Sequence, residues 1–162
     1  IRDRASFDGV FAIESVCYAE HKKDFLIEAR RLLRPGGSLV VSDGYLLPDQ
    51  VPTRFRRDYQ RFLKGLALDS LGGFDAFRQD LVECGFQDID VLPLNDKIMR
   101  SAWYIELLSW IGLAVCAIGC TLRLMPKGWF DHGLAGISQR RLFANNIIQY
   151  AIFTARRSST QP

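Results

Sequence analysis

The chain has 162 residues, which suits one domain with a sizeable core, and its hydrophobic (48%) and charged (24%) fractions are those of a globular protein. A net charge of +3 is too small to indicate a nucleic-acid partner, and the four cysteines lack the spacing of a zinc site or a disulfide scaffold. The charged opening stretch lacks the pattern of a signal peptide, so a cytoplasmic protein with no bound metal is expected.

The first predicted elements form a strand–helix–strand unit. Residues 7–13 are a short apolar run bounded by polar residues, as in a buried strand. Residues 24–34 place apolar side chains on one helical face and charged ones on the other. A Pro-Gly-Gly turn at 35–37 ends this helix, and residues 38–42 are again apolar. This order predicts two parallel strands joined by a right-handed crossover.

The rest of the chain alternates in the same way up to a long insertion. Helices are expected at 52–68 and 74–84, and strands at 89–94 and 147–155. Pro93 would have to lie at the end of its strand or at a sheet edge, because proline cannot donate to a strand ladder.

The insertion covers residues 95–146 and contains all three tryptophans. Its segment 107–122 has no charged residue. At ~1.5 Å per residue this segment would be about 24 Å long, short of a ~30 Å bilayer core. A buried or interfacial helix is therefore expected rather than a membrane span.

An ordered set of motifs resembles the second half of class I S-adenosylmethionine-dependent methyltransferases. The resemblance is nearest to the small-molecule and lipid branch, which includes sterol and tocopherol methyltransferases. It is strongest over residues 6–46 and loosest over 95–146. The matching residues are Phe7-Asp8, Glu14-Ser15, "LLRPGG" at 32–37, Asp43 and the ending "NNIIQYAIFTARR" at 145–157.

The resemblance implies an α/β, Rossmann-like methyltransferase fold. Residues 1–162 would be a single partial domain with strands in the family's order 4-5-7-6, the last of them antiparallel, and a helical insertion or lid at about 95–146. The implied function is transfer of a methyl group from S-adenosylmethionine to a small, lipophilic acceptor. The family's glycine-rich cofactor loop and its ribose-binding acidic residue do not occur in the sequence. A C-terminal fragment with weak cofactor binding and an open edge at strand 7–13 is therefore expected.

The candidate site residues follow the carboxyl ends of the predicted parallel strands, where open α/β sheets bind ligands. Methyl transfer needs positioning and sometimes removal of a proton. Each candidate also has a plainer explanation, as a surface carboxylate, loop aromatic, solvated histidine or ordinary turn. The candidates are Glu14, Tyr18 and His21 for catalysis; Ile13, Glu14 and Ser15 for the cofactor; and Tyr18, Asp43, Tyr45 and Trp103 for the substrate.

Two other interpretations stay open. The chain could belong to another doubly wound enzyme with a nucleotide cofactor, or it could be a non-enzymatic, membrane-associated module built around residues 102–125. Peripheral contact with a membrane is compatible with the methyltransferase hypothesis too. The basic helix at 52–68 is either a solvated face or a contact for an anionic substrate or lipid head group. Its cationic residues are Arg54, Arg56, Arg57, Arg61 and Lys64.

Overall fold

The computed structural model describes residues 5–121 and 128–159, which divide into two compact units. The single partial domain expected from the sequence stays a prediction. The helical unit includes residues 48–70 in addition to the predicted insertion. The sheet unit comprises Ile1–Leu47, Leu71–Leu94 and Gln149–Pro162, and the helical unit comprises Pro48–Ser70 and Asn95–Ile148.

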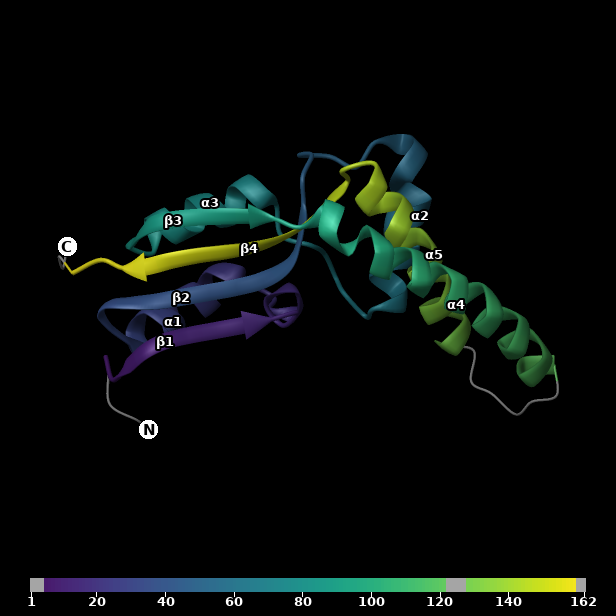
Figure 1. The fold of residues 1–162 in the computed structure, drawn as a ribbon, viewed down its shortest axis with the longest axis horizontal. Coiled ribbons are helices and arrows are strands. Elements are labelled where there is room, and N and C mark those ends of the chain that lie inside the picture. Colours follow the sequence, from purple (N-terminus) through teal and green to yellow (C-terminus); the bar gives the residue numbers. More distant parts are fainter. Residues whose placement is uncertain (1–4, 122–127, 160–162) are drawn as a thin grey trace. The chain divides into compact units, whose positions relative to one another are not determined.

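The sheet unit contains a four-stranded sheet in the order β1-β2-β4-β3. β1 pairs with β2 in parallel, and β3 pairs with β4 antiparallel. Figure 1 shows β4 running opposite to its neighbours. This is the predicted order 4-5-7-6 with an antiparallel last strand. The strands are β1 (Phe7–Ile13), β2 (Leu33–Leu46), β3 (Phe86–Pro93) and β4 (Ile148–Arg157).

Two helices, α1 (Lys22–Leu32) and α3 (Phe74–Glu83), lie on the same side of this sheet (Figure 1). Alternate residues of β2 point toward them and are buried, because successive side chains of a strand face opposite ways. The resulting core is aliphatic under α1 and aromatic under α3. Its fully buried members include Leu26, Leu33, Leu39, Val41, Phe77, Leu81 and Phe153.

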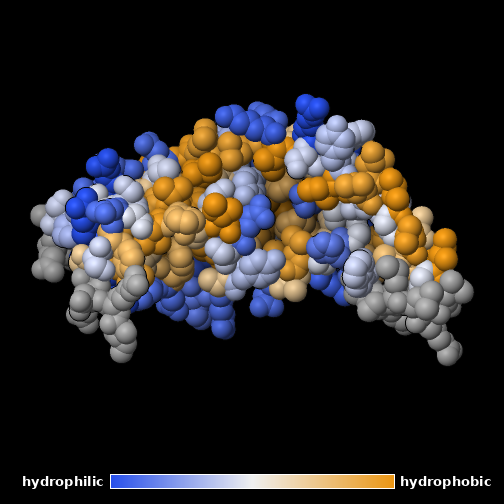
Figure 2. All heavy atoms as spheres, turned by 60° about the horizontal axis from the view of Figure 1, so that its bottom comes forward, coloured by the Kyte–Doolittle hydropathy of each residue, from blue (hydrophilic) through white to orange (hydrophobic). Residues whose placement is uncertain are grey.

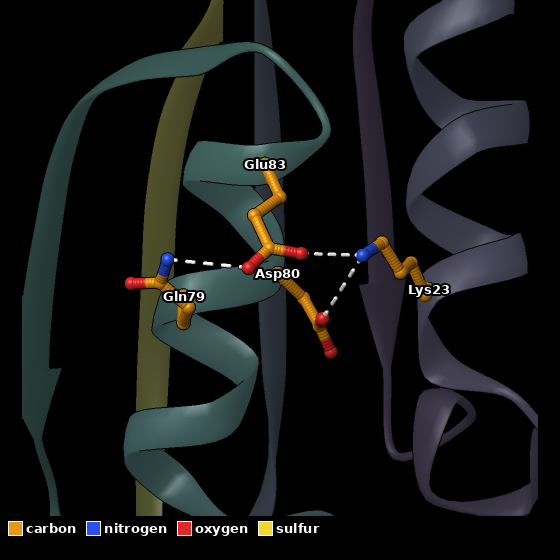
Figure 3. Close-up of polar contacts among 4 residues, drawn as sticks. All are labelled: Lys23, Gln79, Asp80 and Glu83. Carbon is orange, nitrogen blue, oxygen red and sulfur yellow. Dashed lines mark hydrogen bonds and ion pairs between the residues drawn. The ribbon is translucent and has the colours of Figure 1, made fainter.

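An exposed polar cluster joins the two helices. Lys23 Nζ of α1 lies 2.5 Å from Glu83 Oε2 and 3.9 Å from Asp80 Oδ1 of α3 (Figure 3). Gln79 Nε2 donates to the other oxygen of Glu83 at 3.2 Å. Because these groups are exposed to water, the ion pairs contribute little to stability. The apolar core, and not this cluster, holds α1 and α3 on the sheet.

Element boundaries differ from the predicted ones where glycine or proline was taken as a stop. β2 begins at Leu33, so the Pro-Gly-Gly segment lies inside the strand instead of before it. Gly36 has a φ of +75°, a conformation that glycine adopts without strain. Pro93 lies at the end of the edge strand β3, as predicted. β1 is the opposite edge, and Phe11 (77%) and Ile13 (63%) are exposed there. The predicted open apolar edge is therefore present.

The helical unit consists of α2 (Arg56–Gly65), α4 (Asn95–Thr121) and α5 (Gly128–Ala144), preceded by a short 3-10 turn, η2 (Thr53–Phe55). Both α2 and α4 pack against α5. The side chain of Asn95 donates to the carbonyl oxygens of Phe143 (3.3 Å) and Ile148 (2.9 Å). This buried amide ties the start of α4 to the segment that ends α5 and begins β4.

Among the described helices, α4 has a stretch, Asn95–Gly119, that is long and apolar enough to cross a membrane by length and composition. Only 17% of its most apolar window is buried. Most of this window is therefore exposed in the described part of the chain, unlike a buried core helix, and the interfacial alternative stays a prediction.

Candidate functional site

The first feature of the site is the sharp turn at the carboxyl end of β1. Ile13 closes the strand, and the backbone N–H of Glu14 still donates to the carbonyl of Ser42 at 2.9 Å. Glu14 itself has a φ of +46°, in the left-handed region that costs a non-glycine residue about 1 kcal/mol or more. This conformation ends the ladder and turns the Glu14 side chain away from the path of β1.

A chain of hydroxyl and carboxyl groups crosses this end of the sheet. Ser42 Oγ of β2 donates to Tyr150 Oη of β4 at 3.2 Å, and Tyr150 Oη donates to Glu14 Oε1 at 3.0 Å. Partial burial raises the pKa of the Tyr150 phenol; the hydrogen bond from Ser42 lowers it and the Glu14 carboxylate raises it. The phenol therefore stays protonated and remains a donor to Glu14.

Asp43 anchors the loop that follows Glu14. Its side chain is buried, Oδ2 accepts the backbone N–H of Cys17 at 2.9 Å, and Oδ1 accepts that of Gly44 at 2.8 Å. Burial, with a further contribution from the Asp43 carboxylate, raises the pKa of Cys17 to about 12. Asp43 thus holds the loop to β2, and its predicted contact with a substrate stays a prediction.

Tyr18 and His21 fall in different places. Tyr18 ends the 3-10 turn η1 (Val16–Tyr18) and is 58% exposed, with a pKa raised first by desolvation and then by Cys17 and Glu14. Ser15 caps η1 through its backbone only. His21 precedes α1 and borders a separate hollow of about 260 Å³ that Lys22, Gly72 and Gly73 also line. Tyr18 thus follows Glu14 closely in the sequence and is exposed, whereas His21 lines the hollow beside Gly72 and Gly73.

Comparisons of the sequence with known proteins find methyltransferases. A family model described as a methyltransferase domain matches residues 1–41. Sterol 24-C-methyltransferase of Kluyveromyces lactis is 27% identical over 107 residues, which are 65% of this chain and 29% of that protein. The 2-methyl-6-phytyl-1,4-hydroquinone methyltransferase of Synechocystis is 24% identical over 172 residues, covering 96% of this chain and 50% of that protein.

Solved structures give the same result for the fold. The cyclopropane synthase MmaA2 of Mycobacterium tuberculosis superposes with a TM-score of 0.75 at 16% identity, covering 94% of this chain and 56% of that one. A geranyl diphosphate C-methyltransferase of Streptomyces coelicolor gives 0.66 at 17% identity, covering 96% and 49%. In sequence and in fold, this chain is thus similar to S-adenosylmethionine-dependent methyltransferases. Its matches span 29% and 50% of the length of the two methyltransferases compared in sequence.

The glycine pairs of the chain bear on how it could contact the methyltransferase cofactor. A glycine-rich cradle would lie between a strand and a following helix. Here Gly36 and Gly37 lie within β2, and Gly72 and Gly73 precede α3. Neither glycine pair lies in such a cradle. Ile13, Glu14 and Ser15, at the carboxyl end of β1, stay the predicted contacts for S-adenosylmethionine.

Tyr45 and Trp103, two of the predicted substrate residues, belong to different units of the chain. Tyr45 is 2% exposed in the aromatic core, 5.0 Å from Phe77 and 4.9 Å from Phe153 between ring centroids. Its hydroxyl is buried with no hydrogen-bond partner in the described part of the chain, and burial raises its pKa. Tyr45 therefore belongs to the aromatic core, and its contact with a substrate stays a prediction. Trp103 belongs to the helical unit, where it is 46% exposed and packs edge-on against Tyr104.

Tyr150 and Ser42 are site residues that the sequence interpretation did not identify. A signal for Tyr150 was nevertheless available. It is a polar aromatic residue at the start of an apolar strand, and the start of an antiparallel strand lies beside the carboxyl ends of its parallel neighbours. Ser42 similarly ends the apolar run 38–42.

Proposed function

We propose that this chain serves the transfer of a methyl group from S-adenosylmethionine to a small, lipophilic acceptor. The supporting observation is the Ser42–Tyr150–Glu14 chain, which places a fixed carboxylate at the carboxyl end of β1. Open α/β sheets bind ligands at this edge. In this proposal Tyr150 holds the Glu14 side chain, whose carboxylate orients the acceptor or faces the positive charge of the cofactor. Tyr18 lies at the edge of the acceptor site.

The lipophilic character of the acceptor is supported from two sides. Two relatives are named for sterol and phytyl-hydroquinone methylation. The helical unit also presents large apolar side chains to solvent, with Trp103 among them as a candidate acceptor contact. Such an acceptor resides in a bilayer, so peripheral contact with a membrane forms part of the same proposal.

The experiment uses the natural protein that contains these residues, with methyl-labelled S-adenosylmethionine and three acceptors: a sterol, a prenylated hydroquinone and an isoprenoid diphosphate. We expect label in at least one of them and at least a tenfold loss of kcat/KM in Glu14→Gln. Glu20→Gln, in the same exposed loop, is the matched control and should keep full activity. Absence of cofactor binding would overturn the methyl-transfer proposal. Cofactor binding with transfer only to polar acceptors would overturn its lipophilic part.

A further inference from the structure

The contact between α4 and α5 is formed mostly by small residues, whereas a helix pair in water buries its large apolar side chains. The α4 residues that face α5 are mostly small, and Ala102 and Cys116 are buried among them. On the α5 side, a Cβ added to Gly136 would lie 2.1 Å from Ser109 Oγ, and one added to Gly133 would lie 2.8 Å from the Leu113 side chain. The two backbones therefore approach closely through small residues.

Most large apolar side chains of α4 are exposed instead, with the exception of Leu113, which is buried. We name the exposed residues, together with two at the start of α5, the apolar face. Their exposed fractions lie between 38% and 65%. In Figure 2, orange residues run along the right-hand part of the molecule, over α4. The apolar face consists of Trp103, Tyr104, Ile105, Leu107, Leu108, Trp110, Ile111, Val115 and Ile118 of α4 and Trp129 and Phe130 of α5.

This arrangement indicates which solvent the pair prefers. In water, amphipathic helices bury their large apolar side chains against each other. In lipid there is no such driving force, so helices associate through small residues and turn large apolar side chains outward. An apolar face of this extent on a soluble protein marks an interaction surface.

The distribution of charge favours an anionic lipid surface over a second copy of the chain. The helical unit has 11 Lys and Arg against 6 Asp and Glu, a net charge of +5, whereas the sheet unit has 10 against 12, a net charge of −2. Two copies that met through their helical units would bring together like charges. Anionic lipid head groups attract each nearby Lys or Arg by about 1 kcal/mol.

The length of the uncharged segment of α4 indicates how deeply this helix would lie in a bilayer. Segment 107–122 follows Glu106, and the nearest cations in the sequence are Arg100 before it and Arg123 after it. A helix of this length would be about 24 Å long, short of a ~30 Å bilayer core, which favours a position in the interface over a span. Tryptophans at positions 103, 110 and 129 are the residues preferred at that depth.

We propose that the apolar face is a docking surface for an anionic lipid bilayer, into whose interfacial layer α4 inserts parallel to the membrane plane. The proposal deepens the peripheral contact that forms part of the proposed function, and it requires no catalysis.

The test is flotation of the full chain with vesicles of phosphatidylcholine alone and with an equimolar mixture of phosphatidylcholine and phosphatidylglycerol. We expect binding to the mixed vesicles, at least tenfold weaker binding to phosphatidylcholine alone, and a fall in binding as salt is added. Because all three tryptophans lie in the helical unit, their emission should shift to the blue on binding.

Ile118→Asp on the apolar face should reduce binding at least tenfold. Ile27→Asp is the matched control: it changes an isoleucine of similar exposure (54% against 65%), also on a helix, but in the sheet unit, and it should bind like the parent chain. Circular dichroism checks that both variants are folded. Equal flotation of Ile118→Asp and the parent chain would overturn the proposal. So would a concentration-dependent dimer in sedimentation that Ile118→Asp abolishes, since this would identify a second copy as the occupant. Methyl transfer to a detergent-dispersed acceptor by the natural protein reports separately on the proposed function.

Discussion

At the scale of single residues, Glu14 is restrained both in its backbone and in its side chain. Its backbone keeps a positive φ while its N–H remains bonded to Ser42, and its side chain accepts the phenol of Tyr150. A strained backbone of this kind persists only where neighbouring contacts determine it, and such positions are common at functional sites. The restraint therefore supports a positioning role for Tyr150.

We expect Tyr150→Phe to lower kcat/KM for methyl transfer by the natural protein about three- to tenfold. The variant removes the hydrogen bond that the phenol donates to the Glu14 carboxylate. A hydrogen bond to a charged group contributes about 1.5–3 kcal/mol, and less where water competes. Ser42→Ala, which leaves the Tyr150–Glu14 bond in place, should have a smaller effect. Steady-state kinetics on both variants is the measurement. An unchanged kcat/KM in Tyr150→Phe would show that Glu14 needs no such support.

Tyr45→Phe should be neutral or stabilising by up to about 1 kcal/mol, because the Tyr45 hydroxyl is buried without a partner in the described part of the chain and a buried unpaired hydroxyl costs free energy. Urea unfolding measures the free energy, and kinetics on the natural protein measures the activity. Full activity would agree with its place in the core. Loss of activity with unchanged stability would support its predicted substrate role.

The sequence located part of this site and missed part of it for one physical reason. Glu14 and Ser15 follow a strand directly, so local pattern was enough to place them at the strand's carboxyl end. Tyr150 is 136 residues away from Glu14 in the chain, and their contact depends on which strands are neighbours. Sheet order follows from the resemblance to a family, whereas the register that brings a phenol to a carboxylate is fixed only by packing.

At the scale of elements, the loop after β1 is held to β2 by Asp43, and Cys17 provides a probe of that contact. We expect Cys17 in the folded chain to react with iodoacetamide at pH 9 about two orders of magnitude more slowly than in urea, because its pKa is raised to about 12 and only the thiolate reacts. Since the folded pKa is above the unfolded one, the corresponding stability is complete below pH 9 and is lost as the pH rises from 9 toward 12.

Asp43→Asn should speed the reaction of Cys17, because it removes both a negative charge and a good acceptor for the loop. Cys84 serves as the internal control, since burial is the first cause of its raised pKa and Asp43 is not among the causes. Mass spectrometry distinguishes the two modified cysteines. If Asp43→Asn left the rate at Cys17 unchanged, Asp43 would not be the anchor.

Two glycines of the helical unit should respond with opposite signs to the same substitution. In Gly65→Ala the new Cβ would lie 2.4 Å from the Ala135 Cβ and from the Asp131 carbonyl oxygen, so α2 has to move off α5, at a cost of about 1–3 kcal/mol. In Gly112→Ala the Cβ meets nothing within 4 Å, and alanine should stabilise α4 by about 1 kcal/mol. Urea unfolding followed by tryptophan fluorescence measures both. Equal shifts in the same direction would contradict the packing described.

The sequence predicted the type of nearly every described element, but not all of their limits. Hydrophobic periodicity sets helix or strand, and this gave β1 and α3 almost to the residue. The Pro-Gly-Gly segment was predicted as a turn because these residues commonly stop helices. In the structure it continues into β2, since an edge partner allows a strand to begin before its apolar part. Whether the apolar run of α4 was buried or interfacial could not follow from composition, which is apolar on every side of the helix.

At the scale of the whole molecule, the two units are interleaved along the chain. The two segments of the helical unit, Pro48–Ser70 and Asn95–Ile148, are joined by Leu71–Leu94, which is folded into the sheet unit. While the sheet unit is folded, that connection has fixed ends. Once it unfolds, the connection becomes a flexible loop whose closure costs the helical unit up to a few kcal/mol. The stabilities of the two units should therefore be coupled through the chain itself, whatever contact they make.

Phe77→Ala tests this coupling. Phe77 is buried in the aromatic core of the sheet unit, so its truncation should cost about 3–5 kcal/mol there. We expect the urea midpoint followed by tryptophan fluorescence to fall as well, although every tryptophan lies in the helical unit. Val82→Ala, at an exposed position of the same helix, should leave both midpoints nearly unchanged. Far-UV circular dichroism follows both units together. If it showed an earlier transition in Phe77→Ala while the tryptophan midpoint stayed in place, the helical unit would be independent of the connection that runs through the sheet.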